Sequence, residues 1–98
     1  MTPQQTVAAW FHSINAKDKT AQTFVSARFK AGWRRPADWS TFRDLRCLTQ
    51  AQTSSSATIR CDFSESPSLD EGNPDRFWEI HLTHQTSGQW LITNYGQG

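Results

Sequence analysis

The sequence lacks long apolar runs, a strong net charge and an obvious catalytic motif. No apolar stretch approaches the roughly 20 residues that a membrane span requires, and no basic segment followed by an apolar one opens the chain. We therefore expect no membrane insertion of this segment and no signal peptide. The net charge of +1 gives the whole molecule no strong attraction to nucleic acid or anionic membranes.

Residue patterns that mark catalysis or metal binding are also missing. There is no nucleophile elbow, glycine-rich phosphate loop or pair of catalytic carboxylates. His81 and His84 stand three apart on a predicted strand, so they point to opposite faces and cannot bind one metal ion together. Glu79 and His81 share a strand face, which we interpret as a solvated face or an interface rather than an acid–base pair. We expect no catalytic residue, metal or cofactor, and favour a non-enzyme.

What the sequence does have is enough apolar material for one core. Its 98 residues suit a single domain spanning 1–98, and its apolar and charged fractions, 36% and 19%, favour a folded chain. Five tryptophans and six phenylalanines supply much of this core, because each aromatic ring buries a large area.

The first half of the chain has helical spacing. Thr2-Pro3-Gln4-Gln5 forms a capping box with proline at the first helical position, and a stop is expected between Asn15 and Asp18, where Asn15 tolerates a left-handed conformation. The apolar stripe of this helix consists of Val7, Trp10, Phe11 and Ile14. A second helix is predicted from about Lys19 to Arg28, and a short third turn could begin at Pro36. One face of the second helix carries Ala21, Phe24, Val25 and Arg28.

From Phe42 onward the apolar period is two, which predicts strands. Runs 43–51 and 57–65 flank Thr53-Ser54-Ser55, and a hairpin centred on Ser54 pairs residues whose numbers sum to 108. This register brings together apolar or mixed pairs, opposite charges and both cysteines. The predicted pairs are Leu45 with Phe63, Cys47 with Cys61, Thr49 with Ile59, Arg43 with Glu65, and Arg46 with Asp62.

A loop from Ser66 to Asp75 leads to a second predicted hairpin. Its apolar residues all have even numbers, so they share one face only if the connecting loop has an odd number of residues. Thr86-Ser87-Gly88 fits a three-residue loop with Gly88 in the left-handed position. The face consists of Trp78, Ile80, Leu82, Trp90 and Ile92. The fold class is therefore α+β, with N-terminal helices packed on a curved four-stranded antiparallel sheet.

The two cysteines allow two interpretations. Cys47 and Cys61, opposite each other on neighbouring strands, form either a disulfide or a pair of buried thiols that behave as small apolar residues. Disulfides persist mainly in oxidising compartments. An extracytoplasmic location is favoured if the bond forms, and a cytoplasmic one otherwise.

This order of elements resembles the nuclear transport factor 2-like superfamily, also called cystatin-like or SnoaL-like. Residues 2–11 look like the opening helix of that group, and residues 15–18 like the turn before its second helix. Residues 78–82 and 88–92 resemble its closing hairpin. The ending at residues 94–98 is similar to that of small bacterial members of unknown function, several of them extracytoplasmic accessory domains. The resemblance implies a cone-like architecture with a cleft between helices and sheet.

We interpret the chain as a non-enzymatic binding or assembly module that forms a homodimer or binds another protein domain. Self-association is expected through the outer face of the sheet, where Phe77, Leu91 and Tyr95 would otherwise be exposed. One alternative is a small-molecule-binding protein or enzyme that uses the cleft. The cleft candidates are Trp10, Phe11, Trp33, Trp78 and Trp90. The other alternative is binding of nucleic acid or an acidic partner through Arg28–Arg46, where cations alternate with rings. Nucleic acid is the less favoured partner, because the net charge is low.

Overall fold

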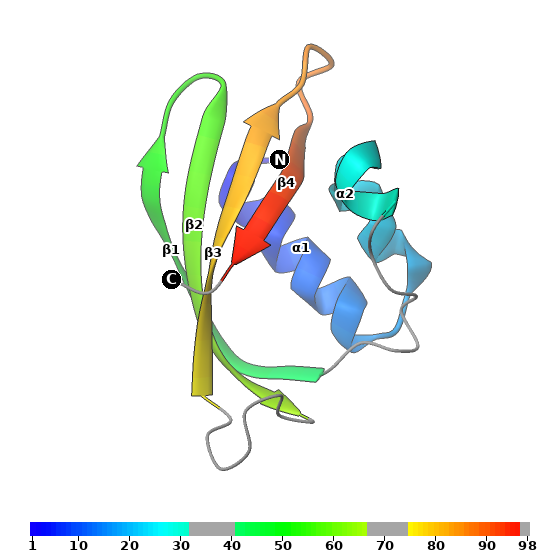
Figure 1. The fold of residues 1–98 in the computed structure, drawn as a ribbon, viewed down its shortest axis with the longest axis vertical. Helices are drawn as coiled ribbons and strands as arrows, with labels where there is room; N and C mark the ends of the chain where they lie inside the picture. Colours follow the sequence, from blue (N-terminus) through cyan, green and yellow to red (C-terminus); the bar gives the residue numbers. More distant parts are fainter. Residues whose placement is uncertain (32–40, 67–74, 97–98) are drawn as a thin grey trace.

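In the computed structural model, described here for residues 1–31, 41–66 and 75–96, helices lie on one side of an antiparallel sheet (Figure 1). The elements are α1 (Pro3–Asn15), η1 (Lys19–Phe24), α2 (Ala27–Ala31), β1 (Thr41–Gln52), β2 (Ser56–Ser66), β3 (Asp75–His84) and β4 (Trp90–Gly96). The four strands are ordered β1-β2-β3-β4, so each strand pairs with its neighbour in sequence. The predicted α+β class and the antiparallel meander are confirmed.

Helix α1 begins as its sequence predicts. The Thr2 hydroxyl accepts a hydrogen bond from the Gln5 backbone N–H at 3.1 Å, and the Gln5 side chain accepts one from the Thr2 backbone N–H at 2.8 Å. This capping box satisfies two helix-terminal donors. The helix ends at Asn15, within the predicted stop, but the left-handed residue that follows is Lys17, with φ of 56°.

The predicted second helix is wrong as one continuous element. Residues 19–24 form a 3₁₀ helix, Val25 is extended with φ of −116°, and α2 starts only at Ala27. Val25 forms a parallel bridge with Ile92, and the Ser26 N–H donates to the Ile92 carbonyl at 2.9 Å. Val25 is β-branched and therefore has a weak preference for the helix. At this point the chain pairs with β4 instead of continuing the helical hydrogen bonds. The third turn at Pro36 lies outside the described residues.

The start of η1 is set by Asp18. Its carboxylate accepts hydrogen bonds from the Thr20 N–H at 2.9 Å and from the Thr20 hydroxyl at 2.8 Å. These bonds favour the charged form of the carboxyl, first through the backbone N–H and then through the hydroxyl, and so lower the pKa of Asp18 below its usual 3.8. Asp18 thus acts as the N-cap of this short helix.

The centre of the first hairpin has the predicted register. Cys47 lies opposite Cys61, Arg46 opposite Asp62, and Thr49 opposite Ile59. The connection at residues 53–55 is closed by a hydrogen bond from the Thr53 N–H to the Ser56 carbonyl at 2.8 Å. The spacing of cysteines and charges therefore located the middle of this hairpin correctly.

The predicted register fails toward the start of β1. Arg43 faces Ser64 instead of Glu65, and Leu45 has no partner, because an irregularity lies between Arg43 and Arg46. Asp44 adopts φ of 54° within this irregularity, a conformation that aspartate tolerates better than most residues. The bulge shifts the pairing by one residue, so the predicted Arg43–Glu65 and Leu45–Phe63 pairs are wrong.

The turn of the second hairpin is as predicted. Gly88 has φ of 90°, and the Gln85 N–H donates to the Gln89 carbonyl at 2.7 Å. Leu82 lies opposite Ile92, so the even-numbered apolar residues do share the face that meets the helices. The loop expected from Ser66 to Asp75 is shorter than predicted, because Ser66 ends β2 and Asp75 begins β3.

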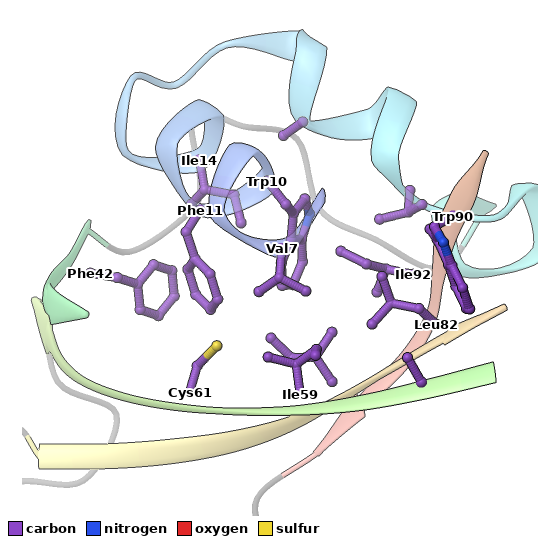
Figure 2. Packing of buried hydrophobic residues seen from close by; sticks show 14 of the residues in the cluster. Val7, Trp10, Phe11, Ile14, Phe42, Ile59, Cys61, Leu82, Trp90 and Ile92 are labelled. Carbon is purple, nitrogen blue, oxygen red and sulfur yellow. The ribbon is translucent and has the colours of Figure 1, made fainter. Parts of the chain in front are cut away.

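The core fills the space between α1 and the concave face of the sheet. Figure 2 shows Val7, Trp10, Phe11 and Ile14 pointing from α1 toward the strands, and each is at most 1% exposed. From the sheet, Ile59, Ile80, Leu82 and Ile92 meet them and are equally buried. The predicted helical stripe is therefore the helix side of the core.

Candidate functional site

Two of the five cleft candidates belong to the interior itself. Trp10 is 0% and Phe11 1% exposed, and their ring centroids lie 5.1 Å apart. Phe11 also meets Phe42 at 5.3 Å and Phe63 at 5.8 Å. These rings fill the concave side of the sheet with the protein's own side chains.

Trp78 joins this aromatic cluster at its rim, where it is only partly buried. Its ring lies 6.3 Å from Trp10 and 4.9 Å from Phe63. Tyr95 packs on it at 4.3 Å, closer than any other ring described. The structure therefore brings Trp10, Phe11 and Trp78 together, and it adds Tyr95 to them.

The position of Tyr95 corrects the prediction that it lies on the outer face. An irregularity in the β3–β4 ladder leaves Thr93 without a partner, so Tyr95 lies opposite Ile80 on the inner face. The Thr93 hydroxyl donates to the His81 carbonyl at 3.2 Å beside this irregularity. Strict alternation along β4 would have put the Tyr95 side chain on the outer face, with those of Leu91 and Thr93. The extra residue in the bulge turns the Tyr95 side chain to the inner face.

Trp90 lies at the other end of the core, away from the aromatic cluster (Figure 2). It is 7% exposed and stacks on the His84 ring with centroids 4.6 Å apart and planes 15° apart. His81 points to the opposite face, where its ring lies 3.2 Å from the Thr58 hydroxyl. Trp33, the fifth cleft candidate, lies outside the described residues.

Cys47 and Cys61 form a disulfide, which decides between the two interpretations of these residues. Their Cα atoms are 4.1 Å apart, the close spacing of a pair without mutual backbone hydrogen bonds. Cys61 is fully buried below Phe11 (Figure 2). The bond therefore links β1 to β2 on the face that the helix covers.

Side chains from α1 hold the outer edge of β1. The Asn15 amide donates to the Phe42 carbonyl and accepts from the Phe42 N–H, both at 2.8 Å, as a neighbouring strand would. Farther along β1, the Gln4 amide donates to the Cys47 carbonyl at 3.2 Å. These bonds occupy backbone groups that an edge strand leaves unpaired.

The outer face of the sheet carries charges of both signs and some apolar surface. The Arg60 guanidinium lies 3.2 Å from the Asp62 carboxylate and 4.0 Å from the centre of the Phe77 ring. Glu79 lies opposite Arg60 on β3, and Arg46 lies opposite Asp62 on β1. Leu48, the neighbour of Arg60 on β1, is 69% exposed.

A hollow of about 570 Å³ lies where the start of α2 approaches β4. Among the described residues, those that line it are Ser26, Arg28, Phe29, Thr93 and Asn94. The bond from the Ser26 N–H to the Ile92 carbonyl holds the two elements together at this point. Sequence reasoning missed this site, because its two sides are more than 60 residues apart and the second contains the bulge at Thr93.

The basic stretch Arg28–Arg46 is only partly described. Its rings at Phe29 and Phe42 pack against the core, whereas Arg43 and Arg46 on β1 are exposed. Within residues 1–31, 41–66 and 75–96, no three histidine, cysteine or acidic side chains are placed to hold a metal ion. None of the helices described has the length and apolar character needed to cross a membrane.

No family model, curated protein or solved structure matches this chain.

Proposed function

We propose that this chain is a non-enzymatic binding or assembly module with the cone-like architecture of the nuclear transport factor 2-like superfamily. The observation that carries the proposal is the filling of the concave side by Trp10, Phe11, Phe42 and Phe63. Enzymes generally bind substrates in a concave pocket that their own core leaves open. A domain that fills this space binds through its surface instead.

The surface proposed for assembly is the outer face of the sheet, and the proposed partner is a second copy. This face carries charges of both signs, with Arg46 and Arg60 beside Asp62 and Glu79. A face that carries both signs can be complementary to itself across a two-fold axis. Leu48 and the partly exposed Phe77 and Leu91 supply apolar area for such a contact.

Part of this face is already ordered for binding. The carboxylate of Asp62 holds the Arg60 guanidinium over the Phe77 ring, so the three side chains restrain one another. Side chains that are ordered before association lose less entropy when a partner binds. The Arg60–Asp62–Phe77 group is therefore the proposed centre of the contact.

The proposed setting is a bacterial extracytoplasmic protein in which this domain is an accessory part. The bacterial origin rests on the resemblance of the chain's ending to small bacterial members of the superfamily. The compartment rests on the disulfide between Cys47 and Cys61, since such bonds persist mainly in oxidising surroundings. Expression in an oxidising compartment should give protein whose mass rises by two hydrogen atoms on reduction.

Sedimentation velocity at micromolar concentrations tests the assembly. We expect a dimer for the wild type and a monomer for Leu91→Arg, which places a charge on the outer face. Ala8→Arg is the matched control, because Ala8 is exposed on α1, which lies on the other side of the sheet. A wild type that stays monomeric across this range, or equal effects of the two arginines, would contradict the proposal.

A further inference from the structure

The hollow between α2 and β4 is a second place where this domain could bind a molecule, and it is separate from the outer-face contact. Its volume of about 570 Å³ falls within the range of small-ligand pockets. One wall comes from Ser26, Arg28 and Phe29, and the other from Thr93 and Asn94. It lies at the β4 edge of the sheet rather than inside the filled aromatic cluster.

Some of the hydrogen-bonding groups that line this hollow already have partners within the protein, and others are available to a ligand. The Ser26 hydroxyl oxygen accepts from the Phe29 N–H at 3.2 Å, which leaves its O–H free to donate. The side-chain oxygen Oδ1 of Asn94 accepts from the Tyr95 N–H at 2.9 Å, which leaves the two N–H groups of the side-chain amide available as donors. The Thr93 hydroxyl donates to the His81 carbonyl at 3.2 Å and so presents an acceptor rather than a donor. The hydroxyl of Ser26 on one wall and the amide of Asn94 on the other therefore both offer donors to a ligand.

Arg28 adds a positive charge to these donors. Its side chain is exposed and lines the hollow, and no acidic side chain in the described ranges forms an ion pair with it. A guanidinium presents several N–H donors in one plane, which suits a carboxylate or a phosphate group. The combined charge and donor set would leave a neutral or cationic ligand poorly matched.

The Phe29 side chain supplies the apolar part of the lining. Its ring lies 5.5 Å from Tyr95 and 6.3 Å from Trp10, so it is fixed against the aromatic cluster. A ring held in this way offers a rigid apolar wall beside the charged group. A ligand with an anionic end and a flat apolar body would match both features.

We propose that this hollow binds a small organic anion through Arg28, Asn94 and Ser26, with its apolar body against Phe29. The anionic group is a carboxylate or a phosphate, and the two differ in charge and number of acceptor oxygens. This site goes beyond the proposed function and does not depend on self-association, because it shares no residue with the outer-face contact.

Backbone amide NMR of the labelled protein tests the proposal with three probes. Benzoate and phenyl phosphate carry the two anionic groups, and benzyl alcohol is the neutral counterpart with the same ring. We expect both anions to shift the amide signals of residues 26–29 and 93–95 and the alcohol to bind at least about tenfold more weakly. The tighter of the two anions identifies the preferred group.

Two variants separate a specific site from general attraction. Arg28→Gln should weaken binding of the better anion by about tenfold or more, because it removes a charge-assisted hydrogen bond. Lys30→Gln removes the same charge two residues away, outside the lining, and should change affinity by less than about twofold. The spectra of both variants also report whether the fold is intact.

Four results would overturn the proposal. They are equal losses in the two variants, shifts confined to residues outside the hollow, benzyl alcohol binding as tightly as the anions, and no binding of either anion. Asn94→Ala gives an independent check, because it removes two donors without changing the charge. A variant with wild-type affinity for both anions would contradict the assigned role of Asn94.

Discussion

Strand β2 presents unlike rows of side chains to the two sides of the sheet. Every inward residue described is at most 4% exposed, and the row consists of Ala57, Ile59, Cys61 and Phe63. The outward row contains Arg60 and Asp62, whose side chains are 39% and 53% exposed. The inner face gains its stability from burial, whereas the outer face holds an ion pair in contact with water. Folding therefore depends on the inner row, and the outer row is the one that we propose for recognition.

The two faces should differ most in how much the free energy of unfolding falls when one aliphatic side chain on each face is truncated. Ile59→Ala should lower the free energy of unfolding by about 2–5 kcal/mol, because it leaves a cavity under α1. Leu48→Ala should change it by less than about 0.5 kcal/mol, because Leu48 is 69% exposed. Urea unfolding of dilute protein measures both.

The same pair of variants also sharpens the assembly proposal. If Leu48 lies in a dimer contact, the effect of Leu48→Ala should grow with protein concentration, because association stabilises the folded chain by mass action. The effect of Ile59→Ala on the free energy of unfolding should be the same at all protein concentrations, because Ile59 lies in the core and outside the contact. If both variants lowered the free energy of unfolding by similar amounts in dilute protein, the inner face would not be the main source of stability.

The next largest effect on the free energy of unfolding is expected from the disulfide, which lies on the inner face. Cys47 and Cys61 are separated by 14 positions, and closing a loop of this length should stabilise the fold by about 3 kcal/mol. Reduction of the wild type and the double substitution Cys47→Ala, Cys61→Ala should therefore lower the unfolding free energy by similar amounts. An unchanged urea midpoint after complete reduction would contradict this expectation.

Sequence reasoning succeeded where short-range chemistry decides the structure. The capping box at Thr2 and the stripe from Val7 to Ile14 are local to one helix. The register around Cys47 and Cys61 could be found because cysteines, charges and apolar residues all favour one alignment. Gly88 marks a turn because few other residues adopt its φ. Each of these features depends on residues close in sequence or on several agreeing pairs.

The failures share a different cause, namely bulges and long-range pairing. Counting in twos cannot detect an extra residue, so Arg43 was paired wrongly and Tyr95 was placed on the wrong face. Asp44 carried a weak signal, because aspartate is among the residues that tolerate a positive φ. Val25 pairs with Ile92, which is 67 positions away, and its β-branched side chain gives only a weak local signal for leaving the helix. The hollow beside β4 depends on both the bulge at Thr93 and the long-range pairing of Val25 with Ile92.

A smaller effect is expected at the edge where α1 holds the sheet. Asn15→Ala removes both hydrogen bonds to the Phe42 backbone and should cost about 1–2 kcal/mol of unfolding free energy. Gln4→Ala is the control, because its exposed bond to the Cys47 carbonyl should cost less than about 0.5 kcal/mol. Faster hydrogen exchange at the Phe42 amide in Asn15→Ala alone would locate the effect. Equal exchange in the two variants would argue against this role for Asn15.

The smallest effect on folding is expected on the outer face, at Asp62. Asp62→Asn removes a half-exposed ion pair with Arg60 and should change the unfolding free energy by less than about 0.5 kcal/mol, with the difference shrinking further in salt. Dimerisation should respond more strongly, because Asp62 both supplies negative charge to this face and holds Arg60 over Phe77. Sedimentation and urea unfolding of the same variant separate the two. A loss of stability without a loss of dimer would mean that the ion pair supports the fold rather than recognition.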